Sequence, residues 1–195
     1  SKFGGRLEPP CHVDVQLHKG RSDLQIVTQA ESLDTFTSLR SDPDRFAEAS
    51  ALLEVAERLA PEGEGDRRRY DMLVGALRTL DQRPSPLLVP AFFLKVLAHE
   101  GLAPTLDACV RCQATEHLVA IDVGEGGVLC DDCRRGRPVS ESALAVMRAV
   151  LGGHLATALE VEDARVCGEV DAVATDAIEY HLERRVRSRR VMEKA

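Results

Sequence analysis

Aromatic side chains are scarce in this chain of 195 residues, which has five phenylalanines, two tyrosines and no tryptophan. Only Phe3 and Phe36 lie near its first predicted strands, so extensive stacking on nucleic-acid bases is not expected there. No apolar run reaches the roughly 20 residues of a membrane-spanning helix, and the start lacks the pattern of a secretory signal peptide. We also find no Gly-x-Ser-x-Gly, phosphate loop or His-Glu-x-x-His. These absences argue against a membrane-spanning protein and against an enzyme.

The net charge is −7 at pH 7, which excludes a uniformly basic coat for nucleic acid. Both ends of the chain are nevertheless basic: residues 1–22 carry more basic than acidic groups, and residues 184–190 contain five arginines. The middle is therefore strongly acidic, and a polyanion would be held by the ends or by local patches. For the arginine run two interpretations stay open. It binds phosphate or an acidic peptide, or it is a solvated helix end favoured by the helix dipole.

Alternation of apolar and polar residues predicts two strands, at 11–17 and 24–30. Two strands alone are marginal in water. Because the chain also opens on what resembles the middle of an element, we expect further strands upstream of Ser1.

Helical periodicity begins near Asp42, which suits an N-cap and is followed by Pro43. The apolar spacing places Phe46 and Tyr70 on inward faces, and Pro90 predicts a late helix start or a kink. A nearly continuous apolar stretch predicts a central buried helix, and Ser140 is a candidate cap. The predicted helices are 42–59, 70–80, 87–99, 140–151 and 167–187. The layout is a short β segment followed by a helical domain with a cysteine-rich insert.

Four of the six cysteines form two Cys-x-x-Cys pairs, Cys109 with Cys112 and Cys130 with Cys133, separated by 17 residues. One tight turn of this kind delivers two thiolates at the angle that tetrahedral Zn²⁺ needs, and two turns complete the shell. We therefore predict one bound Zn²⁺. Four thiolates leave no open position for water or substrate, so the predicted site is structural and not catalytic.

Other uses of these cysteines are less well supported. A disulfide framework suits an exported protein, and a redox dithiol needs only one pair, usually on a βαβ unit that we do not find. Ligand number alone leaves iron as an alternative to zinc. Four arginines lie close to the pairs, and they either offset the negative thiolate cluster, which we favour, or contact phosphate. They are Arg111, Arg134, Arg135 and Arg137.

Several segments, taken in order, resemble RecO, a family of bacterial DNA repair and recombination mediators. They are residues 1–9 with the strand that follows, 92–104 directly before the first cysteine pair, 126–133 around the second, and 180–189. Together they span nearly the whole chain.

The resemblance implies an α+β fold. A partial N-terminal OB-fold β-barrel would occupy residues 1–36, followed by an all-α domain at 37–195 with an inserted zinc ribbon at 105–137. The first strands of the barrel would lie upstream of this chain. The family's partner-binding pocket would be apolar with a basic rim, although Pro90 and Ala91 stand where a basic residue is expected.

The resemblance also implies binding of single- and double-stranded DNA, annealing of complementary strands, and loading of RecA onto DNA coated by single-strand-binding protein. The expected partners are RecR and the acidic C-terminal tail of single-strand-binding protein, and the expected location is the cytoplasm, with the nucleoid. Our candidate DNA contacts are Lys2, Arg6, Lys19, Arg21, Arg184, Arg185, Arg187, Arg189 and Arg190.

Two further hypotheses remain beside a DNA-binding mediator. The acidic middle supports an adapter that uses its zinc ribbon only for protein contacts. A metal- or thiol-dependent enzyme is disfavoured by the closed ligand shell.

Overall fold

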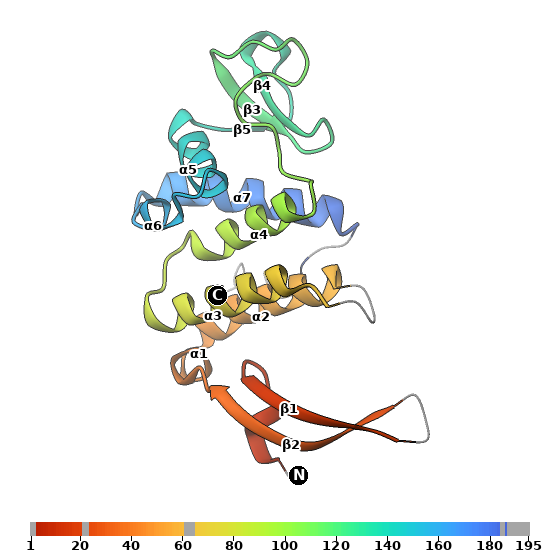
Figure 1. The fold of residues 1–195 in the computed structure, drawn as a ribbon. Helices are drawn as coiled ribbons and strands as arrows, with labels where there is room; N and C mark the ends of the chain where they lie inside the picture. The colour runs from red at the N-terminus through yellow and green to blue at the C-terminus, as the bar shows by residue number, and fades with distance from the viewer. Residues whose placement is uncertain (1–2, 21–23, 61–64, 184–185, 187–195) are drawn as a thin grey trace.

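A computed structural model describes residues 3–20, 24–60, 65–183 and 186. It is a mixed α+β structure with two small sheets and several helices (Figure 1). A hairpin lies at one end, a three-stranded ribbon at the other, and the helices between them (Figure 1). No helix among the described residues is long and apolar enough to cross a membrane. The main helices are α2 (Pro43–Leu59), α3 (Arg67–Gln82), α4 (Leu88–His99), α5 (Glu141–Leu151) and α7 (Ala164–His181), and the short ones α1 (Thr37–Ser41) and α6 (Leu155–Ala158).

The two predicted strands form an antiparallel hairpin, β1 (His12–Lys19) and β2 (Gln25–Asp34), preceded by a 3₁₀ turn, η1 (Gly4–Leu7). β2 runs four residues further than expected. Apolar side chains of the hairpin region stay largely exposed, among them Leu17, Leu24 and Ile26. The described residues form no closed barrel, so the OB-fold remains a prediction.

The helices begin where the sequence supplies caps. The Asp42 carboxylate accepts backbone N–H bonds at 3.0 and 3.3 Å at the start of α2, and Ser140 Oγ accepts one at 3.2 Å at the start of α5. Pro90 lies in the first turn of α4, where an N–H has no partner within the helix, and the helix begins at Leu88, one residue after the start of the predicted range. These three predictions are confirmed.

α4 is the central helix. Almost all of its side chains are buried, and Phe93 and Leu94 have no exposed surface. It lies against α7 and α5 on one side and against α3 and α2 on the other (Figure 1). The predicted central buried helix is confirmed.

Four predictions about helix faces and ends are wrong. Phe46 and Tyr70 are 42% and 45% exposed, and Tyr70 faces the hairpin. Periodicity identifies the apolar stripe of a helix, but it does not say which element packs against that stripe. The last helix starts three residues early, since Asp163 caps it at 3.0 Å. It ends at His181 instead of residue 187, because Glu183 takes a left-handed φ of 51°.

The ribbon consists of β3 (Leu118–Asp122), β4 (Gly127–Cys130) and β5 (Arg137–Pro138), in the antiparallel order β4-β3-β5. Arg148 of α5 holds it against the helices by donating two hydrogen bonds, of 2.7 and 3.2 Å, to the carbonyl of Leu106. Arg137 forms an ion pair with Asp176 of α7. The ribbon is thus fixed to the helical body by side chains on two helices.

Candidate functional site

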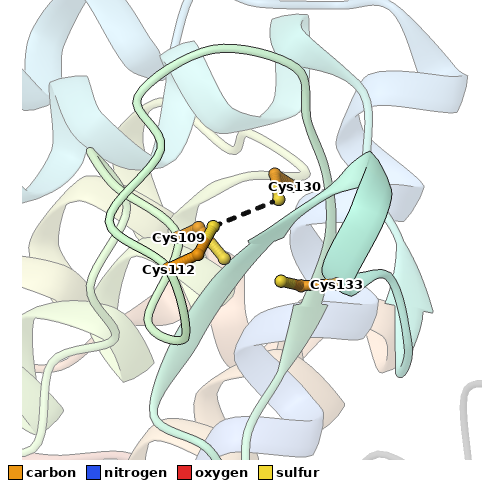
Figure 2. A group of neighbouring side chains, drawn as sticks. All are labelled: Cys109, Cys112, Cys130 and Cys133. Carbon is orange, nitrogen blue, oxygen red and sulfur yellow. Dashed lines mark hydrogen bonds between the residues drawn. The ribbon is translucent and has the colours of Figure 1, made fainter.

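The two cysteine pairs meet at the ribbon (Figure 2). Cys109 and Cys112 lie in the loop before β3, Cys130 ends β4, and Cys133 ends the short 3₁₀ helix η2 (Asp131–Cys133). All four sulfur atoms lie within 4.8 Å of one another, and those of Cys112 and Cys130 are 3.5 Å apart. The fold therefore brings together residues that 17 intervening positions separate in sequence.

Local backbone geometry explains why each pair turns back on itself. In the first, the Cys109 N–H donates to Ala114 at 2.8 Å, and its carbonyl accepts from the Gln113 N–H at 2.9 Å. Gln113 takes a φ of 65° to close this turn. In the second, the N–H of Asp131 bonds to the carbonyl of His117 at 3.0 Å and ties the turn to the start of β3.

The thiols of Cys109 and Cys133 differ in their pKa. Burial opposes ionisation of Cys109, but the backbone N–H groups of Cys130, Cys112 and Arg111 outweigh it and lower the pKa of Cys109 to about 6. Hydrogen bonding to Cys112 and burial raise the pKa of Cys133 to about 12. A Cys109 thiolate therefore forms readily, and its negative charge makes ionisation of a neighbouring thiol less favourable. A bound cation would offset this repulsion between thiolates.

The donor set fits a metal ion held by four thiolates. A tetrahedral ion with metal–sulfur bonds of about 2.3 Å needs sulfurs about 3.8 Å apart, which agrees with the observed clustering. Cys109 and Cys130 are buried, at 0% and 5% exposure. A shell of four protein sulfurs is closed, so the bound ion would hold the ribbon together and would not bind substrate. The sequence located the possible site correctly, and the identity of the ion remains a prediction.

The four arginines near the cysteines contact carboxylates. Arg111 and Arg135 pair with Glu125, Arg134 with Asp131, and Arg137 with Asp176. Their charges are engaged within the protein, which favours the structural interpretation of these arginines over phosphate contact.

A second feature was not found from the sequence. α3 and α4, with one side chain of α6, enclose an apolar cavity of about 250 Å³ lined by Met72, Ala76, Phe92 and Leu155, with Lys95 at its edge. We call it the α3–α4 groove. A smaller hollow beside it shares Met72 and Lys95 and adds Arg68. Neither Lys95 nor Arg68 forms an ion pair with any described residue. The sequence holds no local signal for the groove, because its lining comes from three helices.

The chain was compared with known proteins. The sequence model of the family described as "Recombination protein O C terminal" matches residues 40–190. A protein from Frankia casuarinae named DNA repair protein RecO is 39% identical over the whole of this chain and 82% of its own length. This chain belongs to the RecO family. Proteins of the same name from Streptomyces griseus and Streptomyces coelicolor are each 38% identical, again over the whole chain and 82% of their own length.

Most of the DNA contacts expected for this RecO-family chain fall outside the described residues. These are Lys2, Arg21, Arg184, Arg185, Arg187, Arg189 and Arg190. Arg6 is described only by its backbone in η1, and Lys19 is an exposed side chain at the end of β1. The structure thus leaves this set as a prediction, with Lys19 as its one described side chain.

Proposed function

We propose that this chain is a DNA-binding mediator in DNA repair and recombination and not an enzyme. It would bind single- and double-stranded DNA, anneal complementary strands and help load RecA onto DNA coated by single-strand-binding protein, in the cytoplasm and on the nucleoid. The observation that carries this proposal is the match over the full chain to relatives each named DNA repair protein RecO.

In this proposal the hairpin belongs to an OB-fold at residues 1–36, and residues 37–195 form the helical domain with its ribbon at 105–137. The exposed Leu17, Leu24 and Ile26 support it, because a hairpin with so many exposed apolar groups needs a cover. One structural Zn²⁺ would keep the ribbon folded. RecR would be a further partner.

DNA would be held chiefly through its phosphates. The scarcity of aromatic residues near the hairpin leaves little for base stacking, and the net charge of −7 confines attraction to local basic groups. Lys19 is exposed at the tip of β1 and forms no ion pair with a described residue, so its charge is available to a polyanion. Binding should then fall steeply as salt rises.

The α3–α4 groove would take the acidic tail of single-strand-binding protein. Its apolar lining suits a buried hydrophobic end residue. Lys95 and Arg68, which form no ion pair with a described residue, would supply two positive charges for the carboxylates. Lys95, at the i+4 position from Ala91 on α4, would place a positive charge one helical turn beyond the position where the family resemblance leads us to expect one.

A paired experiment tests both halves of the proposal. Fluorescence anisotropy would measure binding of a labelled single-stranded oligonucleotide, and of a labelled peptide of aspartates ending in phenylalanine, at two salt concentrations. We expect Lys19→Gln to reduce the salt slope for DNA by about one and to leave peptide affinity unchanged. We expect Lys95→Gln to weaken the peptide at least about fivefold and to leave DNA affinity unchanged.

Each outcome separates the hypotheses. Peptide binding without any salt-sensitive DNA binding would favour the adapter that acts only through protein contacts. DNA binding with a peptide affinity that Lys95→Gln does not alter would remove the groove from the proposal.

A further inference from the structure

Helix α3 lies between the hairpin and α4 (Figure 1), and different side chains of this helix contact the two sides. Tyr70 and Arg78 contact the hairpin. Asp71 and Met72 line the α3–α4 groove. One helix therefore touches both the proposed DNA-binding end and the proposed peptide site.

The contact with the hairpin is a connected polar network. His12 Nδ1 lies 2.6 Å from Asp34 Oδ2, and Arg78 donates to the same carboxylate at 2.8 Å. His12 Nε2 lies 2.6 Å from the Tyr70 hydroxyl. Because a carboxylate only accepts, Nδ1 is the donor, and Nε2 accepts from Tyr70 when the ring is neutral and donates to it when the ring is charged. The tie to Tyr70 therefore persists in both protonation states.

Arg67 extends this network to the groove. Its guanidinium lies 5.9 Å from the centre of the Tyr70 ring, and its Nε donates to both oxygens of Asp71 at 3.0 Å. Asp71 is itself part of the groove lining. The Arg67 side chain is 85% exposed, and among the described residues its guanidinium pairs with Asp71 and lies near the Tyr70 ring. An acidic ligand in the groove would compete with Asp71 for it.

We propose that Arg67 and Tyr70 couple binding of an acidic peptide in the α3–α4 groove to the hold of the helical body on the hairpin. The bound peptide draws Arg67 away from Asp71 and from the Tyr70 ring, and the Tyr70–His12 tie weakens. The hairpin then moves more freely, and DNA binds less tightly. By linkage, DNA weakens the peptide by the same factor. This inference rests on the proposed function of both sites.

The coupling should be modest, because an exposed ion pair and one cation–π contact are each weak. We expect saturating peptide to weaken binding of a single-stranded oligonucleotide about two- to fivefold in the unaltered chain. Tyr70→Phe keeps every charge and removes the hydroxyl, so it should abolish most of this effect. Repulsion between two bound anions would survive that substitution. Tyr180→Phe, an exposed tyrosine at the far end of α7, is the matched control and should keep the full effect.

Hydrogen exchange supplies a second readout that needs no DNA. We expect peptide to speed exchange of the β1 and β2 amides in the unaltered chain and in Tyr180→Phe, and to have no such effect in Tyr70→Phe. Peptide that binds without changing hairpin exchange, or an effect that Tyr70→Phe retains in full, would overturn the coupling while the groove assignment stands. Failure of the peptide to bind would overturn the groove and the coupling together. If DNA alone fails to bind, the exchange measurement still decides the coupling.

Discussion

At the scale of single residues, partners decide what each charge is available to do. Arg111 and Arg135 are the same residue type as Arg68, but both form ion pairs with Glu125, whereas Arg68 pairs with no described residue. The same contrast applies to acids. Asp66 caps α3 and accepts a hydrogen bond from His99 at 2.6 Å, so it joins the start of one helix to the end of another. Sequence composition does not distinguish these residues, because it counts charged groups without their partners.

Asp66 gives a prediction about acid stability. The backbone N–H of Arg69 and the His99 ring lower the pKa of Asp66 from 3.8 to about 2. A lowered folded pKa stabilises the fold above the unfolded pKa, and this contribution is lost as the pH falls through about 2. Asp66→Asn keeps the cap but removes the charge, so it should lower the Tm by a few degrees at pH 5.

Thermal unfolding from pH 5 to pH 2 would measure the effect. The difference between wild type and Asp66→Asn should shrink as the pH falls. Asp66→Ala, which also loses the cap, should stay less stable than both across the range. A gap between wild type and Asp66→Asn that stays constant down to pH 2 would contradict the assigned role.

At the scale of elements, the ribbon depends on a close approach between its first loop and β4. Thr105 and Gly127 form a bridge, with the Gly126 carbonyl accepting from the Thr105 N–H at 2.9 Å. A Cβ at Gly127 would come within 2.5 Å of the Thr105 carbonyl oxygen, a backbone atom that cannot move aside alone. Glycine at this position is therefore required by packing and not by a left-handed φ.

Two glycine substitutions should have opposite effects on stability. Gly127→Ala should destabilise the protein by about 1–3 kcal/mol through overpacking. Gly168 lies inside α7, and a Cβ added there would meet nothing within 4 Å, so Gly168→Ala fits without a clash. It should stabilise the protein by about 0.5–1 kcal/mol, because alanine loses less backbone entropy in a helix. Urea unfolding of both variants measures this, and a neutral Gly127→Ala would show that the loop and β4 separate more easily than the structure indicates.

At the scale of the whole molecule, the hairpin and the ribbon occupy opposite ends of a stack of helices (Figure 1). The proposed metal holds one end, while the proposed DNA-binding residue Lys19 belongs to the other. Loss of the metal should therefore be a local structural event with little direct effect on the hairpin. The link between the ends is the helical body, above all α3 and α4.

Metal removal tests this separation. A zinc chelator, or Cys130→Ser, should speed hydrogen exchange in β3 and β4 and lower the Tm by at least about 5 °C, because ligand binding energy contributes to folding. Exchange in α2 and α3 should change little. Native mass spectrometry should find one zinc per chain in the unaltered protein and none in Cys130→Ser, with Cys11→Ser as the control that keeps it. Loss of a chemical turnover from Cys130→Ser with the fold intact would instead revive the enzyme hypothesis.

The amino-acid sequence by itself determined the features that local chemistry controls. The cysteine spacing located the possible metal site, Asp42 and Ser140 located two helix starts, and apolar continuity identified α4 as the buried centre. Each of these signals lies within a few residues of the structure it specifies, or repeats at the period of one element.

Only the tertiary structure decided which surfaces meet. Tyr70 was assigned to an inward face and instead contacts His12, 58 positions away, and Lys95 joins Arg68 from a different helix. The pairing of Arg137 with Asp176 is of the same kind. Such contacts depend on the relative placement of whole helices and strands, which long-range packing fixes and which no periodicity within a single segment encodes.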